Sequence, residues 1–307
     1  MFTQIKTLDH ILDVYLKNKP HSFLVKFSVG TSVVISIFLV LIKLIAWFIT
    51  DSISMQASMN DSILDALVSF MAYHALKFSC TAYDEDHNYG HEKVEGLVAL
   101  LQCGLVIYSG FVIFKESYEV FLNPHPVSNT AMGIAVMIIS CILVFQLVYV
   151  QQYVARKTES MIVQGDSLHY LSDLFMNACI LISLILSKYF IYVDVICGLG
   201  VGSYVLYGAF LIIKTALKDL MDESLPIETQ KNVREKIESI SGVKSIRLLR
   251  TRSAGMKKYV ESKIEVDEKL SLVAANMICE QVEQRVKGMF DNVDVVIKPV
   301  TGSVKSV

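Results

Sequence analysis

The sequence has few charged residues and few cysteines for its length. Charged residues make up 19% of the 307 residues, hydrophobic residues make up 53%, and the mean hydropathy is +0.49. Soluble domains usually contain about 25% charged residues, so this composition indicates a membrane protein. The six cysteines lack C-x-x-C spacing and fall mostly in apolar stretches, which predicts packing residues rather than a disulfide framework or a thiolate metal site (Cys80, Cys103, Cys141, Cys179, Cys197 and Cys279).

Two further absences concern the ends of the chain. The N-terminal stretch MFTQIKTLDHILDVYLKNKP contains acidic residues and lacks an early apolar core, so we expect no signal peptide. The C-terminal part does not combine a basic face with stacking aromatic side chains, so we expect no binding of nucleic acid.

The composition changes along the chain. Residues 225–307 contain 15 Lys and Arg and 11 Asp and Glu, a net charge of +4, whereas the first 224 residues contain 13 and 19, a net charge of −6. Apolar residues concentrate between about 24 and 217. We therefore expect a cytoplasmic segment at 1–23, a transmembrane domain at 24–217, and a small cytoplasmic domain at 225–300, which by itself would be marginally stable.

Six stretches are candidates for membrane helices of about 20 residues. They cover residues 24–48, 53–78, 93–121, 130–154, 167–188 and 193–216. Basic residues collect on one side, and the positive-inside rule then places both termini in the cytoplasm (Lys17, Lys19, Lys26, Lys77, Lys93, Arg156, Lys157, Lys214 and Lys218). Lys43 lies inside the first stretch, where we expect it to reach the membrane surface or pair with a helix end.

Two ionisable pairs interrupt the second and fifth stretches, and we call these four residues the membrane quartet: Asp61-x-x-x-Asp65 and His169-x-x-x-Asp173. A spacing of four places both members of a pair on one helix face, about 5–6 Å apart at Cβ. Each charge at mid-bilayer costs about 3 kcal/mol on insertion scales. Three carboxylates and one imidazole are suitable ligands for a divalent metal, and interhelical hydrogen bonding is the alternative interpretation.

The loop YDEDHNYGHEKVEGL contains a second group of possible ligands, Asp84, His87 and His91, which we call the loop triad. Its acidic neighbours raise the local concentration of cations. The spacing His-x-x-x-His is a weak signal by itself, and a solvated loop is the alternative. Four other histidines have no nearby ligand partner in the sequence, so we expect structural or solvated roles for them (His10, His21, His74 and His125).

The C-terminal part predicts the order α-β-β-α-β. Apolar periodicity indicates helices at 228–240 and 271–288, and strands are expected at 244–252, 258–266 and 293–298. This order is similar to that of metallochaperone domains. The predicted fold class is therefore an all-α membrane domain of six helices followed by a small cytoplasmic α+β domain.

Several segments together resemble the cation diffusion facilitator family, closest to its bacterial zinc and iron branch. They are SISMQASMNDSILDALVSF, YDEDHNYGHEKVEGL, GDSLHYLSDLFMN, LRTRSAG and CEQVEQRV. The resemblance runs from about residue 24 to 300. It implies a homodimer in the bacterial inner membrane that exports a divalent metal in exchange for protons, with the metal as substrate, no permanent cofactor and no enzymatic activity.

The resemblance also assigns roles to residues. It implies that the membrane quartet is the transport site and that the loop triad is a second metal site. Lys93 and Asp222 match a charge pair that joins the two domains at the dimer axis, although both are alternatively simple interfacial charges. Zinc is the first candidate substrate and iron the second, with cadmium also handled by this branch.

The tail departs from the family pattern, in which histidines build a two-metal site between paired tails. No histidine occurs after residue 169, and the positions that align with family ligands are Arg247, Lys263, Asn276 and Lys298. None of these is a good ligand for a divalent cation. This departure counts against metal binding by the tail, and we hypothesise that fixed charges replace the metal by pairing with acidic residues such as Asp267 or Asp294.

The chemistry of the membrane quartet predicts coupling to protons. Metal binding requires ionised carboxylates and a neutral imidazole, so it releases protons, and His169 is the residue best placed to be protonated from the more acidic side. Two other functions stay open on the sequence alone: a channel or carrier without proton coupling, and a metal sensor or membrane scaffold that moves no ions.

Overall fold

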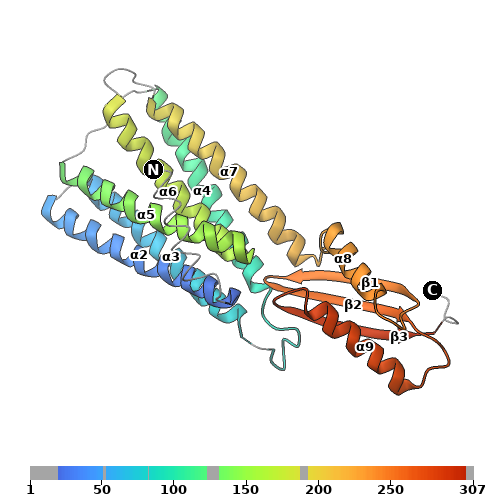
Figure 1. The fold of residues 1–307 in the computed structure, drawn as a ribbon. Coiled ribbons are helices and arrows are strands. Elements are labelled where there is room, and N and C mark those ends of the chain that lie inside the picture. Colours follow the sequence, from blue (N-terminus) through green and yellow to red (C-terminus); the bar gives the residue numbers. More distant parts are fainter. Residues whose placement is uncertain (1–19, 51–52, 82, 123–130, 187–192, 302–307) are drawn as a thin grey trace, which may run out of the picture. The chain divides into compact units, whose positions relative to one another are not determined.

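The computed structural model describes residues 20–50, 53–81, 83–122, 131–186 and 193–301 (Figure 1). Contacts divide the chain into two compact units, with the division between Ala216 and Leu217. Long helices form the first unit, whereas the second combines helices with a three-stranded sheet. This order matches the predicted all-α domain followed by an α+β domain.

Six long helices make up the described part of the first unit and match the six predicted stretches. They are α2 (His21–Thr50), α3 (Ile53–Ser79), α4 (Val94–Leu122), α5 (Ala131–Thr158), α6 (Met161–Leu186) and α7 (Val193–Leu220). The main difference is the start of α6, which begins at Met161 rather than at residue 167. Gly165 and Asp166 precede the expected stretch, but they are buried inside the helix bundle.

Four of the described helices, α2, α4, α5 and α7, are long and apolar enough to cross a membrane. Large side chains such as Val34, Phe48 and Tyr108 are mostly exposed along them, as expected where lipid replaces water as the solvent. The protein is therefore an integral membrane protein. Helices α3 and α6 carry the ionisable pairs, and their crossing of the bilayer remains a prediction.

Helix α6 contacts α2, α3, α4 and α5, so its side chains are held from several directions. Leu168 packs with Cys103 and Val205 in one core cluster, whereas Tyr170 packs with helices α2 and α5 in another. A Cβ added at Gly208 of α7 would lie 2.7 Å from Leu168 Cδ1. This close approach of two helices depends on a small residue, and it fixes the middle of α6.

The second unit follows the predicted α-β-β-α-β order. Its elements are α8 (Ile227–Glu238), β1 (Ser245–Ala254), β2 (Lys257–Glu265), α9 (Leu272–Lys287) and β3 (Val293–Val300). The central strand β2 pairs antiparallel with β1 and parallel with β3. Gly255, with φ of +54°, supplies the left-handed conformation that the β1–β2 turn requires. Ile237, Val260 and Val282 are fully buried in the core between the helices and the sheet.

Candidate metal sites

The two ionisable pairs of the membrane helices meet where α3 faces α6. His169 Nε2 lies 3.0 Å from Asp65 Oδ1 and 3.9 Å from Asp173 Oδ2, so the imidazole lies within reach of two carboxylates from different helices. The three ligand atoms all lie within 4.8 Å of one another. Each side chain is between 15% and 31% exposed. We call these three residues the central triad.

The spacing of the central triad suits a single transition-metal ion. In a tetrahedral site with bonds of about 2.0–2.2 Å, neighbouring ligand atoms lie about 3.3 Å apart. The observed separations of 3.0 and 3.9 Å fall on either side of that value. Asp173 Oδ2 is also buried without a hydrogen-bond partner in the described part of the chain, so its lone pairs are available to a cation.

Asp61 does not join the central triad. It lies one turn before Asp65 on α3 with an exposed side chain, and its role as a fourth ligand stays a prediction. Lys43 of α2 lies against the same helix, where its Nζ donates to the Ser58 carbonyl oxygen at 3.2 Å and to the Ser62 hydroxyl at 2.7 Å. The expected pairing of Lys43 with a helix end is wrong, because it binds groups inside α3 beside the acidic pair.

Asp166 is a buried carboxylate that the sequence analysis missed. It lies one turn before His169 on α6 and is fully buried. Its Oδ2 accepts hydrogen bonds from the Ser32 hydroxyl and the Gln151 amide, both at 2.6 Å. The expected membrane stretch starts at residue 167, so this carboxylate lies just outside it. The available signal was its spacing of three from His169 and seven from Asp173, which places all three on one helix face.

The loop triad forms a second cluster, with all its ligand atoms within 4.8 Å. Asp84 Oδ1 lies 3.1 Å from His87 Nδ1, and Asp84 Oδ2 lies 3.3 Å from His91 Nε2. The backbone N–H of His87 donates to Asp84 and, as the largest cause, lowers the pKa of this exposed carboxyl below its ordinary value. Gly90, with φ of +89°, makes the turn that brings the two histidines together.

The hydrogen bonds of Thr81 determine which nitrogen of His91 is free. The Thr81 hydroxyl donates its proton to the Phe78 carbonyl oxygen at 2.6 Å, so Thr81 Oγ1 accepts from His91 Nδ1 at 3.1 Å. With its proton on Nδ1, a neutral His91 presents the Nε2 lone pair to Asp84 Oδ2. Two lone pairs in such contact need a cation between them, either a metal ion or a proton. The loop therefore has the geometry of a cation site.

The four tail positions lie on the exposed surface of the second unit. Lys263 and Lys298 are register partners on β2 and β3, and both side chains are exposed. Arg247 Nε lies 2.7 Å from Glu265 Oε2, and Asn276 donates to Glu280 at 3.2 Å. Neighbouring ammonium groups repel a divalent cation, so this face is unsuited to metal binding.

The acidic partners differ from those hypothesised for the tail. Asp267 pairs with Lys244 at 3.1 Å and Asp294 with Lys257 at 3.5 Å, because each lysine lies near its acid across the ends of the strands. Arg247 does have an acidic partner, although it is a different one, Glu265.

The proposed charge pair of Lys93 and Asp222 falls on two different units, so it stays a prediction. Asp222 accepts a hydrogen bond from Arg252 at 2.8 Å. The Arg252 guanidinium also lies 4.4 Å from the centre of the Tyr259 ring, which fixes this arginine at the start of the second unit.

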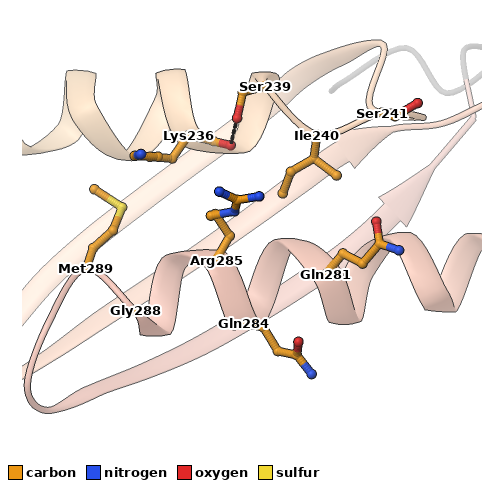
Figure 2. Close-up of a pocket in the computed structure, with 9 residues that line it drawn as sticks. All are labelled: Lys236, Ser239, Ile240, Ser241, Gln281, Gln284, Arg285, Gly288 and Met289. Atoms are coloured by element: carbon orange, nitrogen blue, oxygen red, sulfur yellow. Dashed lines mark hydrogen bonds between the residues drawn. The ribbon is translucent and has the colours of Figure 1, made fainter.

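A hollow of about 520 Å³ lies between α8 and α9 (Figure 2). Two cationic side chains, Lys236 and Arg285, reach into it from the two helices, and its lining contains no histidine, cysteine or carboxylate (Lys236, Ser239, Ile240, Ser241, Gln281, Gln284, Arg285, Gly288 and Met289). Its positive charge and its lack of ligands exclude this hollow as a metal site.

Comparisons with known proteins cover both units. A model of the cation efflux transmembrane domain matches residues 29–221, and a model of the cation efflux protein cytoplasmic domain matches residues 225–299. The cation-efflux pump FieF of Serratia proteamaculans is 35% identical over 275 residues, which are 89% of this chain and 92% of that protein. FieF of Shewanella oneidensis is 34% identical over 278 residues, 90% and 94% of the two chains.

Among solved structures, a cadmium form of the MamM CTD is 26% identical and covers 24% of this chain and 95% of that chain, with a TM-score of 0.24. The family models span most of the sequence, and the two relatives are 35% and 34% identical over 89% and 90% of this chain. The chain therefore belongs to the cation efflux family, the cation diffusion facilitators.

Proposed function

We propose that this protein exports a divalent transition metal, with zinc as the first candidate and iron(II) or cadmium as alternatives, in exchange for protons. The working unit is a homodimer in the bacterial inner membrane, with both termini in the cytoplasm. The central triad binds the metal, and the loop triad binds a second ion on the cytoplasmic side. Membership of the cation efflux family supports the direction of transport.

The observation that carries this proposal is the contact between His169 and Asp65. At 3.0 Å, His169 Nε2 and Asp65 Oδ1 share a proton when no metal is present. A metal ion that binds His169 must take the same Nε2 lone pair, so this proton has to leave. Metal and proton therefore compete for one atom, which is the requirement for exchange when the site opens to each side in turn.

The ligands of the central triad favour zinc and its chemical neighbours. Imidazole suits zinc, iron and similar transition metals, whereas magnesium and calcium prefer oxygen ligands alone. Asp61 or a water molecule supplies the fourth ligand. Measured transport of Zn²⁺, Fe²⁺, Cd²⁺ and Mn²⁺ under one pH gradient would rank these substrates, and a preference for Mn²⁺ over Zn²⁺ would contradict the assignment.

Exposed apolar side chains on the second unit support the homodimer. Leu272, Val273 and Met277 of α9 are 82%, 71% and 57% exposed, and apolar groups at such exposure favour burial against a partner. The molar mass of the detergent-solubilised chain, measured by light scattering, tests this proposal. A monomer mass at micromolar concentration would contradict it.

We also propose that the tail binds no metal, since Lys263 and Lys298 lie side by side on its sheet. Metal analysis of the purified full chain carrying both Asp173→Asn and His91→Ala, which disable the two proposed sites, tests this. About two tightly held zinc ions remaining per protomer would contradict the proposal.

Reconstituted vesicles test the exchange itself. Zinc uptake is measured with and without an imposed pH gradient, and we expect the gradient to accelerate it. Equal rates would reject proton exchange in favour of an uncoupled carrier or channel. Asp173→Asn should abolish zinc flux in a protein that still folds, whereas Glu119→Gln, which changes an exposed acid on α4, should leave flux intact. Full flux in the Asp173 variant would remove this residue from the site.

A further inference from the structure

A fully buried ionisable group lies one turn from the central triad but outside it. Asp166 of α6 accepts hydrogen bonds from Ser32 of α2 and Gln151 of α5. The Gln151 amide also donates to the Ser32 hydroxyl at 2.8 Å, so these three side chains form a closed group. Tyr170, four residues further along α6, is hydrogen-bonded to Ser69 of α3 at 2.7 Å. Polar side chains from three other helices therefore surround this level of α6.

This group has no room for a metal ion. Ser32, Gln151 and Asp166 are already in direct contact with one another at 2.6 to 2.8 Å, whereas an ion would hold its ligands about 3.3 Å apart. Asp166 Oδ1 is nevertheless buried and has no hydrogen-bond partner in the described part of the chain. A proton fits this oxygen without any additional space.

The surroundings make the charge of Asp166 depend on the central triad. No ammonium, guanidinium or imidazole of the described residues lies within ion-pair distance of its carboxylate, and an ionised carboxylate without such a partner is costly inside a protein. The ionisable groups whose charge acts on Asp166 are Asp65 of α3 and His169 of α6 itself. A divalent ion bound by the central triad adds positive charge one turn away, which favours the ionised carboxylate.

We propose that Asp166 holds one of the protons exchanged for the metal, at a site separate from the metal ligands. This inference rests on the proposed metal–proton exchange. When the metal enters the central triad, the Asp166 carboxylic acid loses its proton to water and becomes a carboxylate. When the metal leaves, the carboxylate takes up a proton again. Asp166 thereby couples protons to the metal without touching it.

Calorimetry of zinc binding to the full-length protein tests the proposal. Titrations in buffers of different ionisation enthalpy give the number of protons released for each zinc bound, and the loop triad is disabled throughout by His91→Ala. Asp166→Asn keeps the shape of the side chain but cannot ionise. We expect this variant to bind zinc while releasing fewer protons, by about one per central triad. An unchanged number of protons would overturn the proposal.

A milder pair of variants covers the case in which Asp166→Asn does not fold. Ser32→Ala removes one donor to the ionised carboxylate, so we expect the pH at which the proton is released to rise. Ser28→Ala removes a buried hydroxyl of the same helix that has no hydrogen-bond partner in the described residues, and it should cause no such shift. Identical pH profiles for both variants would overturn the proposal.

The same titrations distinguish the proposed role of Asp166 from the proposed metal–proton exchange on which it rests. If the unchanged protein releases no protons on binding zinc, proton exchange itself fails. If the unchanged protein releases protons and Asp166→Asn releases the same number, exchange stands and only the role of Asp166 fails.

Discussion

Replacing Thr81 by valine tests whether the loop triad is a metal site. Valine keeps the shape of threonine but removes the hydroxyl that accepts the hydrogen bond from His91 Nδ1. That hydrogen bond holds the proton on Nδ1 and leaves Nε2 free for a metal. We therefore expect Thr81→Val to weaken zinc binding by the loop while leaving the central triad unaffected.

The size of the effect follows from the burial of His91. Its side chain is only 4% exposed, so water cannot easily replace the lost acceptor. A buried donor left without a partner costs about 1–3 kcal/mol, which corresponds to about 5-fold to 150-fold weaker binding. Loss of outer hydrogen bonds at known metal sites weakens affinity about 10-fold to 100-fold, in the same range.

The measurement is competition for zinc against a coloured chelator, in a protein whose central triad is disabled by Asp173→Asn. Thr81→Ser restores the hydroxyl and serves as the matched control, with expected affinity close to that of threonine. Circular dichroism checks that the end of α3 is intact, because the Thr81 hydroxyl also donates to the Phe78 carbonyl. Equal zinc affinity for the valine and serine variants would refute the role of Thr81.

Three further predictions concern the loop, the tail and the helix bundle. The lowered pKa of Asp84 keeps its carboxylate ionised well below neutral pH, so its contribution to zinc affinity of the loop, measured by chelator competition, should persist in mild acid and be lost only in strong acid. Ile237→Ala should destabilise the tail by about 2–5 kcal/mol because this side chain is fully buried, whereas the 85% exposed Ile227→Ala should change little; hydrogen exchange of tail amides in the full chain measures both. Gly208→Ala should lower the thermal unfolding temperature, since its Cβ would lie 2.7 Å from a neighbouring leucine, whereas Gly200→Ala meets no atom within 4 Å and should not.

Much of the fold follows from local patterns in the sequence. Apolar runs of more than 20 residues mark α2 and α5 without any tertiary information, and apolar periodicity marks α8 and α9. The start of α6 does not follow, because Gly165 and Asp166 have the composition of a loop. Their burial depends on partners from other helices, such as Gln102, whose Oε1 lies 2.5 Å from a Cβ placed at Gly165. Such partners are not visible within one segment of sequence.

The candidate metal sites were also only partly predictable from the sequence. The spacing of His169 and Asp173 predicts that both lie on one face of α6, and the structure adds that Asp65 of α3 faces them. The position of Asp61 relative to this cluster depends on side-chain orientation, which spacing alone does not determine. The partners of charged residues were the least predictable feature. Lys43 binds inside α3 rather than at a helix end, because that choice depends on how two helices pack.

The placement of Lys43 has a consequence for which ions this transporter rejects. Its ammonium is fixed by Ser58 and Ser62, and Asp61, Asp65 and Asp173 all interact electrostatically with it. The ammonium of Lys43 beside the carboxylates offsets part of their attraction for any dication. Magnesium and calcium, which bind mainly through charge and do not favour imidazole, lose the most from this. If the central triad is the transport site, a lysine that touches no metal would thus lower its affinity for magnesium.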